Sequence, residues 1–178
     1  KGERQAAREL LASFEQSAKQ NRAVQLLPNI QALKCRMELW EGNLDGVERW
    51  MKTAPDEDVE FCSLERYRYL TKVRCYLANG EYMKAQALLE KLRYYAEQTN
   101  RPYVRMETGL LSAITKERAG GPWQDELAAV LREAESYRFL RLITEEGAAV
   151  WPLLQREKKA MQSAGTLDKD WLRRVLDE

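Results

Sequence analysis

The sequence predicts an all-α fold in which antiparallel helix pairs stack one on the next, an α-solenoid. Apolar residues recur at three- and four-residue spacing along most of the 178-residue chain. Part of this pattern repeats with a period of about 38 residues, and we identify no strand. Because one short helix pair cannot bury its apolar stripe alone, successive pairs must stack, and we expect a right-handed superhelix with a concave binding face.

Internal similarity defines the repeat. Residues 31–51 align with residues 69–89, and residues 1–22 align with the second half of the same unit. The first alignment pairs Lys34 with Lys72, Arg36 with Arg74, Leu39 with Leu77 and Gly42 with Gly80. The second alignment places Ala7, Leu10, Leu11, Phe14 and Ala18 over Ala85, Leu88, Leu89, Leu92 and Ala96. Residues 1–22 are therefore interpreted as half of a repeat.

The apolar stripes, glycines and prolines together give a coarse helix map. Helices are predicted near 3–20, 26–41, 43–53, 64–79, 81–99, 103–119, 123–137, 139–158 and 166–177. The clearest internal loop is predicted at residues 54–58. We predict a single helical-repeat domain over 1–178, with units at 1–22, 26–53, 64–101 and 103–137 and C-terminal capping helices at 139–178.

The unit at 64–101 has the pattern of a helical hairpin. Its two stripes meet at Asn79-Gly80, and Gly80 suits the left-handed residue that ends a helix. The predicted core residues of this hairpin are Tyr69, Val73, Tyr76, Leu77, Ala85, Leu88, Leu89, Leu92 and Ala96. The corresponding residues of the next unit are Met106, Leu110, Ala113, Ile114, Leu127, Val130, Leu131 and Ala134. Both units are therefore expected to bury one stripe on each helix.

The composition indicates a chain with no overall attraction to nucleic acid or to an anionic membrane. It has 29 Lys and Arg residues against 28 Asp and Glu residues, a formal charge of +1, and 44% hydrophobic residues. We find neither an uncharged apolar stretch of about 18 residues nor a secretory signal. We therefore expect a soluble, cytoplasmic protein that makes no membrane contact. Because the chain opens with Lys1, we also expect it to be a fragment of a larger protein.

The residues that most often carry catalysis are missing or poorly spaced. The chain has no histidine, which removes the commonest general base and metal ligand. Its three cysteines, Cys35, Cys62 and Cys75, fit neither a disulfide framework nor metal ligation. Cys35 and Cys75 lie on apolar stripes and are predicted to be small buried hydrophobes. We expect no enzyme activity, no cofactor and no metal site.

The acidic clusters are also read as structural. Residues 56–58, with Glu60, lack the ligand spacing of a calcium loop and are interpreted as a solvated linker. Glu145 and Glu146 are adjacent on a predicted helix, so their side chains point to different sides and cannot converge on one substrate atom. Neither cluster predicts acid/base chemistry.

Two motifs resemble known families. The turn at Gly80–Ala85 (GEYMKA) resembles that of a tetratricopeptide repeat (TPR), although the period is longer than that family's usual ~34 residues. The segment at 131–154 is similar to the end of the helical-repeat region of large ATP-binding LuxR-type regulators of the MalT-like type. The matching positions there are Arg141, Glu146, Gly147, Leu153 and Leu154. Phe139 replaces the family's usual Gly-Tyr, and the preceding turn is shorter.

The resemblance implies a TPR-like arm between an N-terminal ATPase and a C-terminal helix-turn-helix domain. Such an arm would sense a small-molecule inducer or a regulatory protein. Neither a phosphate-binding Gly-x-x-x-x-Gly-Lys-Ser/Thr loop nor a basic recognition helix occurs in this chain, so nucleotide and DNA binding would belong to other domains of the parent protein. A generic TPR-like scaffold for protein–protein interaction in another assembly is the alternative, and an enzyme is a distant third.

The candidate binding residues are Arg36, Tyr67 and Arg74. If the first helix of each pair lines the concave face, the two repeat-related arginines project into one groove beside Tyr67. Guanidinium groups and an aromatic ring could hold a carboxylate, a peptide or sugar hydroxyls. We expect Arg36→Ala and Arg74→Ala to reduce the response without changing the thermal midpoint. The alternative is that both arginines cover apolar surface or pair with neighbouring glutamates.

Overall fold

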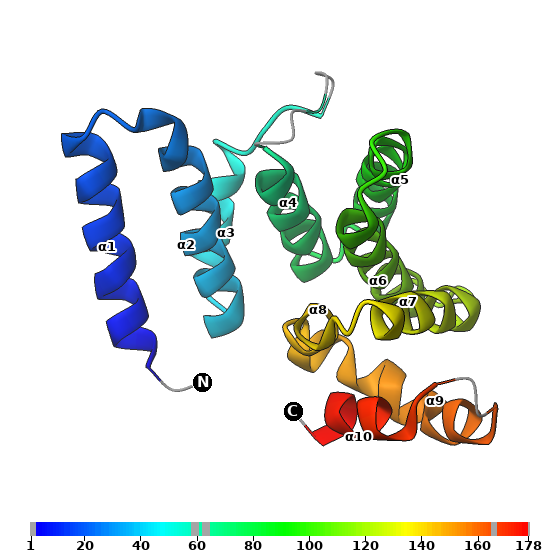
Figure 1. The fold of residues 1–178 in the computed structure, drawn as a ribbon. Helices are drawn as coiled ribbons and strands as arrows, with labels where there is room; N and C mark the ends of the chain where they lie inside the picture. The colour runs from blue at the N-terminus through cyan, green and yellow to red at the C-terminus, as the bar shows by residue number, and fades with distance from the viewer. Residues whose placement is uncertain (1–2, 58–60, 62–64, 165–166, 178) are drawn as a thin grey trace. The chain divides into compact units, whose positions relative to one another are not determined.

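The computed structural model describes residues 3–57, 61, 65–164 and 167–177, and in this part of the chain every regular element is a helix (Figure 1). The predicted all-α fold is therefore confirmed. The elements are α1 (Arg4–Gln20), η1 (Val24–Leu26), α2 (Leu27–Glu41), α3 (Leu44–Met51), α4 (Arg66–Ala78), α5 (Tyr82–Gln98), α6 (Pro102–Arg118), α7 (Gln124–Ser136), α8 (Leu140–Thr144), η2 (Gly147–Ala149), α9 (Trp151–Ala164) and α10 (Lys169–Asp177). None of the helices described is long and apolar enough to cross a membrane.

The helices form two compact units, Lys1–Gly80 and Glu81–Glu178. The division falls at the predicted turn, where Gly80 has a φ of 73°. A side chain at this left-handed conformation would be strained, and glycine removes that strain. Gly42, the repeat mate of Gly80, ends α2 in the same way with a φ of 72°. The turn chemistry therefore repeats together with the apolar stripes.

The first unit is organised around α2. This helix packs against α1, α3 and α4, and α3 also packs against α4 (Figure 1). One cluster of its core is built from three helices; the members are Ala32, Cys35, Val47, Trp50 and Cys75. Leu39, Met51, Ala54 and Tyr67 pack against this core and are partly buried. Cys35 and Cys75 are buried, as predicted.

The second unit is organised around α6, which packs against α5, α7 and α8. Val104, Met106 and every residue from Thr108 to Thr115 are buried. The hydroxyl groups of Thr108 and Thr115 donate hydrogen bonds to backbone carbonyls of their own helix, so their burial leaves no donor without a partner. All the core positions predicted for α5, α6 and α7 are buried.

One predicted helix is wrong. Residues 139–158 do not form a single helix but the separate elements α8, η2 and α9. The break falls at Gly147, which has a φ of 44°, and Pro152 follows in the first turn of α9. Proline has no N–H to donate to a preceding turn, but it is tolerated at a helix start. Helical periodicity alone does not register such a break, because the apolar spacing continues across it.

The predicted linker at 54–58 is solvated only in part over its described residues: Asp56 is exposed, as predicted, whereas Pro55 is buried and Glu57 is partly buried. Asp58 and Glu60 lie outside the described residues. Pro55 is buried, and its carbonyl accepts a hydrogen bond of 2.9 Å from Lys72 Nζ. Glu57 forms an ion pair of 2.7 Å with Lys72 and accepts a hydrogen bond of 2.6 Å from the hydroxyl of Tyr76. The hydroxyl of Tyr69 donates to the carbonyl of Asp56. Polar atoms of α4 therefore fix the course of this loop.

Candidate functional site

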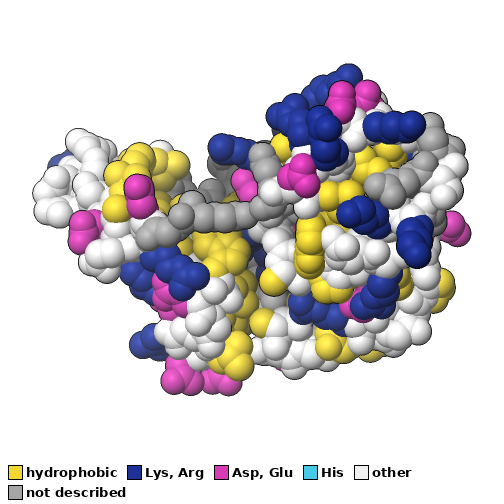
Figure 2. Space-filling view, turned by 90° about the horizontal axis from the view of Figure 1, so that it is seen from below, with side chains coloured by type: hydrophobic (Ala, Val, Ile, Leu, Met, Phe, Trp, Pro, Cys, Tyr) yellow, Lys and Arg dark blue, Asp and Glu magenta, His cyan; other side chains and the backbone are white. Residues whose placement is uncertain are grey.

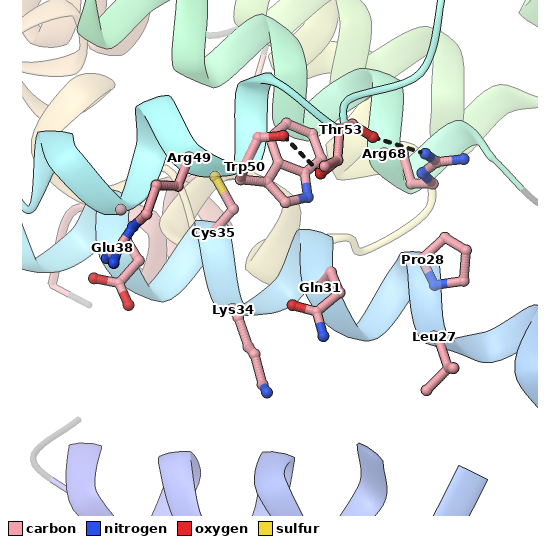
Figure 3. Close-up of a pocket in the computed structure, with 11 residues that line it drawn as sticks. Leu27, Pro28, Gln31, Lys34, Cys35, Glu38, Arg49, Trp50, Thr53 and Arg68 are labelled. Atoms are coloured by element: carbon pink, nitrogen blue, oxygen red, sulfur yellow. Dashed lines mark hydrogen bonds between the residues drawn. The ribbon is translucent and has the colours of Figure 1, made fainter. Parts of the chain in front are cut away.

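A groove of about 580 Å³ lies within the first unit, between α2, α3 and the start of α4 (Figure 3). The wall from α2 is formed by residues at helical spacing: Leu27, Pro28, Gln31, Lys34, Cys35 and Glu38. The opposite wall consists of residues that belong to α3 or follow it, together with one from α4: Gly46, Arg49, Trp50, Thr53 and Arg68. This concave surface therefore depends on how two consecutive helices, α2 and α3, pack against each other and against the start of α4.

Most charged groups around the groove already have a partner. Lys34 forms an ion pair with Glu15 of α1, and hydrogen bonds from Lys19 and Lys34 lower the pKa of Glu15 to about 2. Glu38 pairs with Arg8 at 3.4 Å and accepts a hydrogen bond of 2.6 Å from Asn43. The carboxylate of Glu38 is thus held by two donors.

The opposite wall supplies further donors. Arg68 donates to the Thr53 carbonyl at 3.3 Å and pairs with Glu65. Arg49 is exposed, and no ion pair joins it to another described residue. Trp50 adds an aromatic surface and is 8% exposed. Guanidinium and amide donors beside an aromatic ring suit a ligand or peptide that carries carbonyl, carboxylate or hydroxyl oxygens on one side and apolar atoms on the other.

The three predicted binding residues lie in the first unit, but none of them lines this groove. Arg36 is only 5% exposed, and its guanidinium carbon lies 5.1 Å from the centroid of the Trp40 ring. Arg74 is 8% exposed and donates a hydrogen bond of 3.1 Å to the Leu70 carbonyl. Their burial favours the alternative that they cover apolar surface. Their role in binding stays a prediction, as does that of the half-buried Tyr67.

Both arginines act electrostatically on the same buried thiol. The positive charges of Arg36 and Arg74 both act on Cys75, which lies in the core of the first unit. The repeat alignment related the arginines to each other but gave no sign of this shared neighbour. It could not, because the contact between α2 and α4 depends on the rotation of each helix about its own axis.

Sequence reasoning missed the groove residues Gln31, Arg49 and Trp50. A partial signal existed for α2, because Gln31, Lys34 and Glu38 recur at helical spacing and so form one polar stripe. No comparable signal marks Arg49, which is one of several exposed arginines. The groove exists only because α3 leaves one side of α2 uncovered.

The surface agrees with the near-neutral composition. On the face shown in Figure 2, Lys and Arg side chains occur beside Asp and Glu side chains, and hydrophobic side chains are visible between them. In the described part of the chain, no group of three or more His, Cys, Asp or Glu residues is placed to hold a metal ion.

Paired helices with glycine-ended turns, repeated along an all-α chain, define a TPR-like helical-repeat protein. Residues 1–160 match the family model described as the MalT-like TPR region. The chain therefore belongs to the MalT-like TPR family, as its sequence motifs indicated. No curated protein and no solved structure matches the chain.

Proposed function

We propose that this chain is the ligand- or protein-binding regulatory segment of a LuxR-type transcriptional activator. The observation that carries the proposal is the match of residues 1–160 to the MalT-like TPR region. An inducer or a partner protein binds this segment, and binding changes the state of an ATPase and a DNA-binding domain elsewhere in the parent protein. The segment itself contacts neither DNA nor a membrane.

The groove of the first unit is the binding site that we propose for the inducer or partner. Its volume of about 580 Å³ suits a small molecule or a short peptide segment. Arg49 and Gln31 offer donors to ligand oxygens, and Trp50 offers a flat apolar surface. Because walls come from both α2 and α3, an occupant bridges two helices and alters their relative stability.

The segment has no catalytic activity of its own in this proposal. Histidine is missing from the whole sequence, and Glu38, the carboxylate among the residues that line the groove, is engaged by Arg8 and Asn43. Binding energy is therefore available to shift a conformational equilibrium rather than to stabilise a transition state.

The test is genetic and uses the complete parent protein in the cell that carries it. Deleting the gene should remove a defined set of induced transcripts, measured across the whole genome. Arg49→Ala in the groove should remove most of the same induction, and the matched variant Arg141→Ala, which changes an exposed arginine of α8, should preserve it. If deletion changes no coherent set of transcripts, the regulatory assignment is wrong.

The alternative, a generic TPR-like scaffold, is favoured by the fold alone, since helical repeats serve many assemblies. The two functions differ in what the parent chain contains. Sequencing the complete gene distinguishes them: a regulator carries an ATPase and a helix-turn-helix domain on the same chain, and a scaffold carries neither.

A further inference from the structure

Two thiols meet in the core of the first unit. Cys35 of α2 and Cys75 of α4 place their Sγ atoms 3.5 Å apart, within hydrogen-bond range for sulfur. Cys35 is 2% exposed and Cys75 is fully buried. The two residues are 40 positions apart in the sequence, so tertiary packing alone joins them. A lone buried cysteine is an ordinary small hydrophobe, but two thiols in direct contact can react with each other.

The charges around this thiol pair are unusual for a core. Arg36 directly follows Cys35 in the sequence, Arg74 directly precedes Cys75, and both arginines are buried. Their positive charges act to lower the pKa of the Cys75 thiol. The hydrogen bond with Cys35 and burial act more strongly and raise that pKa, so Cys75 keeps its proton.

The groove gives a small reagent a path to one of the two sulfurs. Cys35 is among the residues that line the groove, and its side chain in Figure 3 extends from α2 into the space beside α3. Cys75 lies behind it in the core, on α4. The two cysteines are therefore not equivalent: a reagent in the groove reaches the Cys35 sulfur first, and the Cys75 sulfur can react only afterwards, with Cys35.

We propose that Cys35 and Cys75 form a redox modification site that reacts with a hydroperoxide and closes reversibly to a disulfide. This proposal stands independently of the regulatory function, because it rests on the contact between the two thiols and on the position of Cys35 in the lining of the groove.

The chemistry proceeds in two balanced steps. Cys35 sulfur attacks one peroxide oxygen; an S–O bond forms, the O–O bond breaks, the departing oxygen takes up the thiol proton of Cys35, and water leaves. Cys75 sulfur then attacks the Cys35 sulfenic acid; the S–S bond forms, the S–O bond breaks, and water leaves with the proton of Cys75. The two thiols lose two electrons, and hydrogen peroxide, as the simplest member of the class, is reduced to two molecules of water.

Closure of the disulfide joins α2 to α4 directly behind the groove. Both helices already pack against each other, so the covalent bond adds a restraint to an existing interface. The groove wall from α2 then loses its freedom to rotate or shift relative to α4. The oxidised unit should therefore show a higher thermal midpoint than the reduced unit.

The decisive experiment uses the complete 178-residue chain without any substitution. The reduced protein is treated with hydrogen peroxide, unfolded, alkylated and digested, and its peptides are mapped by mass spectrometry. We expect a Cys35–Cys75 cross-linked peptide that disappears on treatment with a dithiol reductant. Oxidation of methionine residues shows that enough peroxide was added. If both cysteines are still free thiols and become alkylated at that point, the proposal is wrong. A cross-link that joins either cysteine only to Cys62 would also overturn it.

Two variants test the order of the steps, with Cys62→Ser as the common background. In Cys75→Ser, the sulfenic acid on Cys35 has no resolving thiol, so dimedone should label Cys35 several-fold more than in the background protein. In Cys35→Ser, Cys75 should remain unlabelled. Dimedone labelling of Cys75 in that variant, with the circular dichroism spectrum unchanged, would overturn the assignment of Cys35 as the attacking sulfur. The peptide map of the unsubstituted chain tests the proposal even if a variant fails to fold.

Discussion

The two units use the same helical pattern but bury it to different extents. In the second unit, α6 is covered along almost its whole length, whereas in the first unit α1 buries only Ala18. The repeat alignment makes the contrast direct: Leu88 and Leu92 of α5 are 0% and 1% exposed, while their mates Leu10 and Phe14 of α1 are 61% and 58% exposed. An apolar stripe therefore shows which residues a helix can bury, and the helices packed against it determine which of them are buried.

The difference in burial between the two units also suggests that one unit contributes more to stability and the other more to binding and reactivity. The second unit concentrates large apolar side chains around α6, and the first unit has two thiols in its core beside a polar groove. Side chains that bind or react need access, and dense packing removes it. We therefore expect the second unit to resist unfolding and the first unit to carry the chemistry.

The largest expected effect comes from truncating the centre of the second unit. Leu110→Ala removes a fully buried side chain from α6 and should destabilise the protein by about 2–5 kcal/mol, because a cavity remains after the lost contacts. The matched change Leu10→Ala in α1 should stay within about 0.5 kcal/mol. Urea unfolding followed by circular dichroism measures both. Equal losses at the two sites would remove the contrast between the units.

The next effect tests whether the buried arginines are structural. Arg74→Ala deletes a hydrogen bond to the Leu70 carbonyl and the packing of a largely buried side chain, so we expect a loss of about 1–3 kcal/mol. Arg49→Ala changes an exposed groove residue and should cost less than about 0.5 kcal/mol. An unchanged thermal midpoint in Arg74→Ala would restore the sequence-based expectation that this side chain serves binding.

An effect of similar size comes from glycines inside helices of the two units. A Cβ at Gly109 would lie 2.7 Å from Val130 Cγ2 on the buried side of α7, so Gly109→Ala should cost about 1–3 kcal/mol. A Cβ at Gly46 would lie 2.8 Å from Cγ of Glu38, whose side chain would have to shift. Because alanine favours helix by about 1 kcal/mol over glycine, part of this cost is offset, and Gly46→Ala should destabilise less than Gly109→Ala. Thermal unfolding of the pair would show whether α6 and α7 are the more tightly packed helices.

The smallest effect is a pH dependence confined to the first unit. The pKa of Glu15 is lowered from 4.5 to about 2 by Lys19 and Lys34, so its ion pairs stabilise the folded state above about pH 5. This contribution is lost as the pH falls through the range from about 5 to about 2. Comparing the unfolding midpoints of the original protein and Glu15→Gln at several pH values should show a difference of less than about 1 kcal/mol near neutral pH that vanishes in acid. A constant difference would mean that Glu15 contributes through packing.

Much of the fold could be predicted because it depends on local chemistry. The stripes of α4 to α7 identify their buried residues, since a helix places every third or fourth residue on one side. The break at Gly147 was missed, because the apolar spacing runs through it without interruption. The hydrogen bonds that fix the loop before α4 were missed as well, because their donors Tyr69, Lys72 and Tyr76 belong to the following helix.

The candidate site was much less predictable than the fold. Arg36 and Arg74 were assigned to an open face by analogy with other repeats, and they are buried. A helical wheel gives the angle between two side chains of one helix. It does not show which side of the helix faces its neighbours, because that depends on how the neighbouring helices pack. For the same reason, no pattern in the sequence distinguishes Arg49, which is exposed in the groove, from arginines elsewhere on the surface.

The sequence by itself determined that the chain is helical, that its helices are paired and repeated, and which residues each helix can bury. It did so because hydrogen bonding within a helix and apolar spacing are properties of neighbouring residues. Only the tertiary structure decided that α1 leaves its stripe open, that α2 and α3 form a groove, and that Cys35 meets Cys75 at 3.5 Å. These features depend on contacts between residues distant in sequence, which arise only when the helices pack.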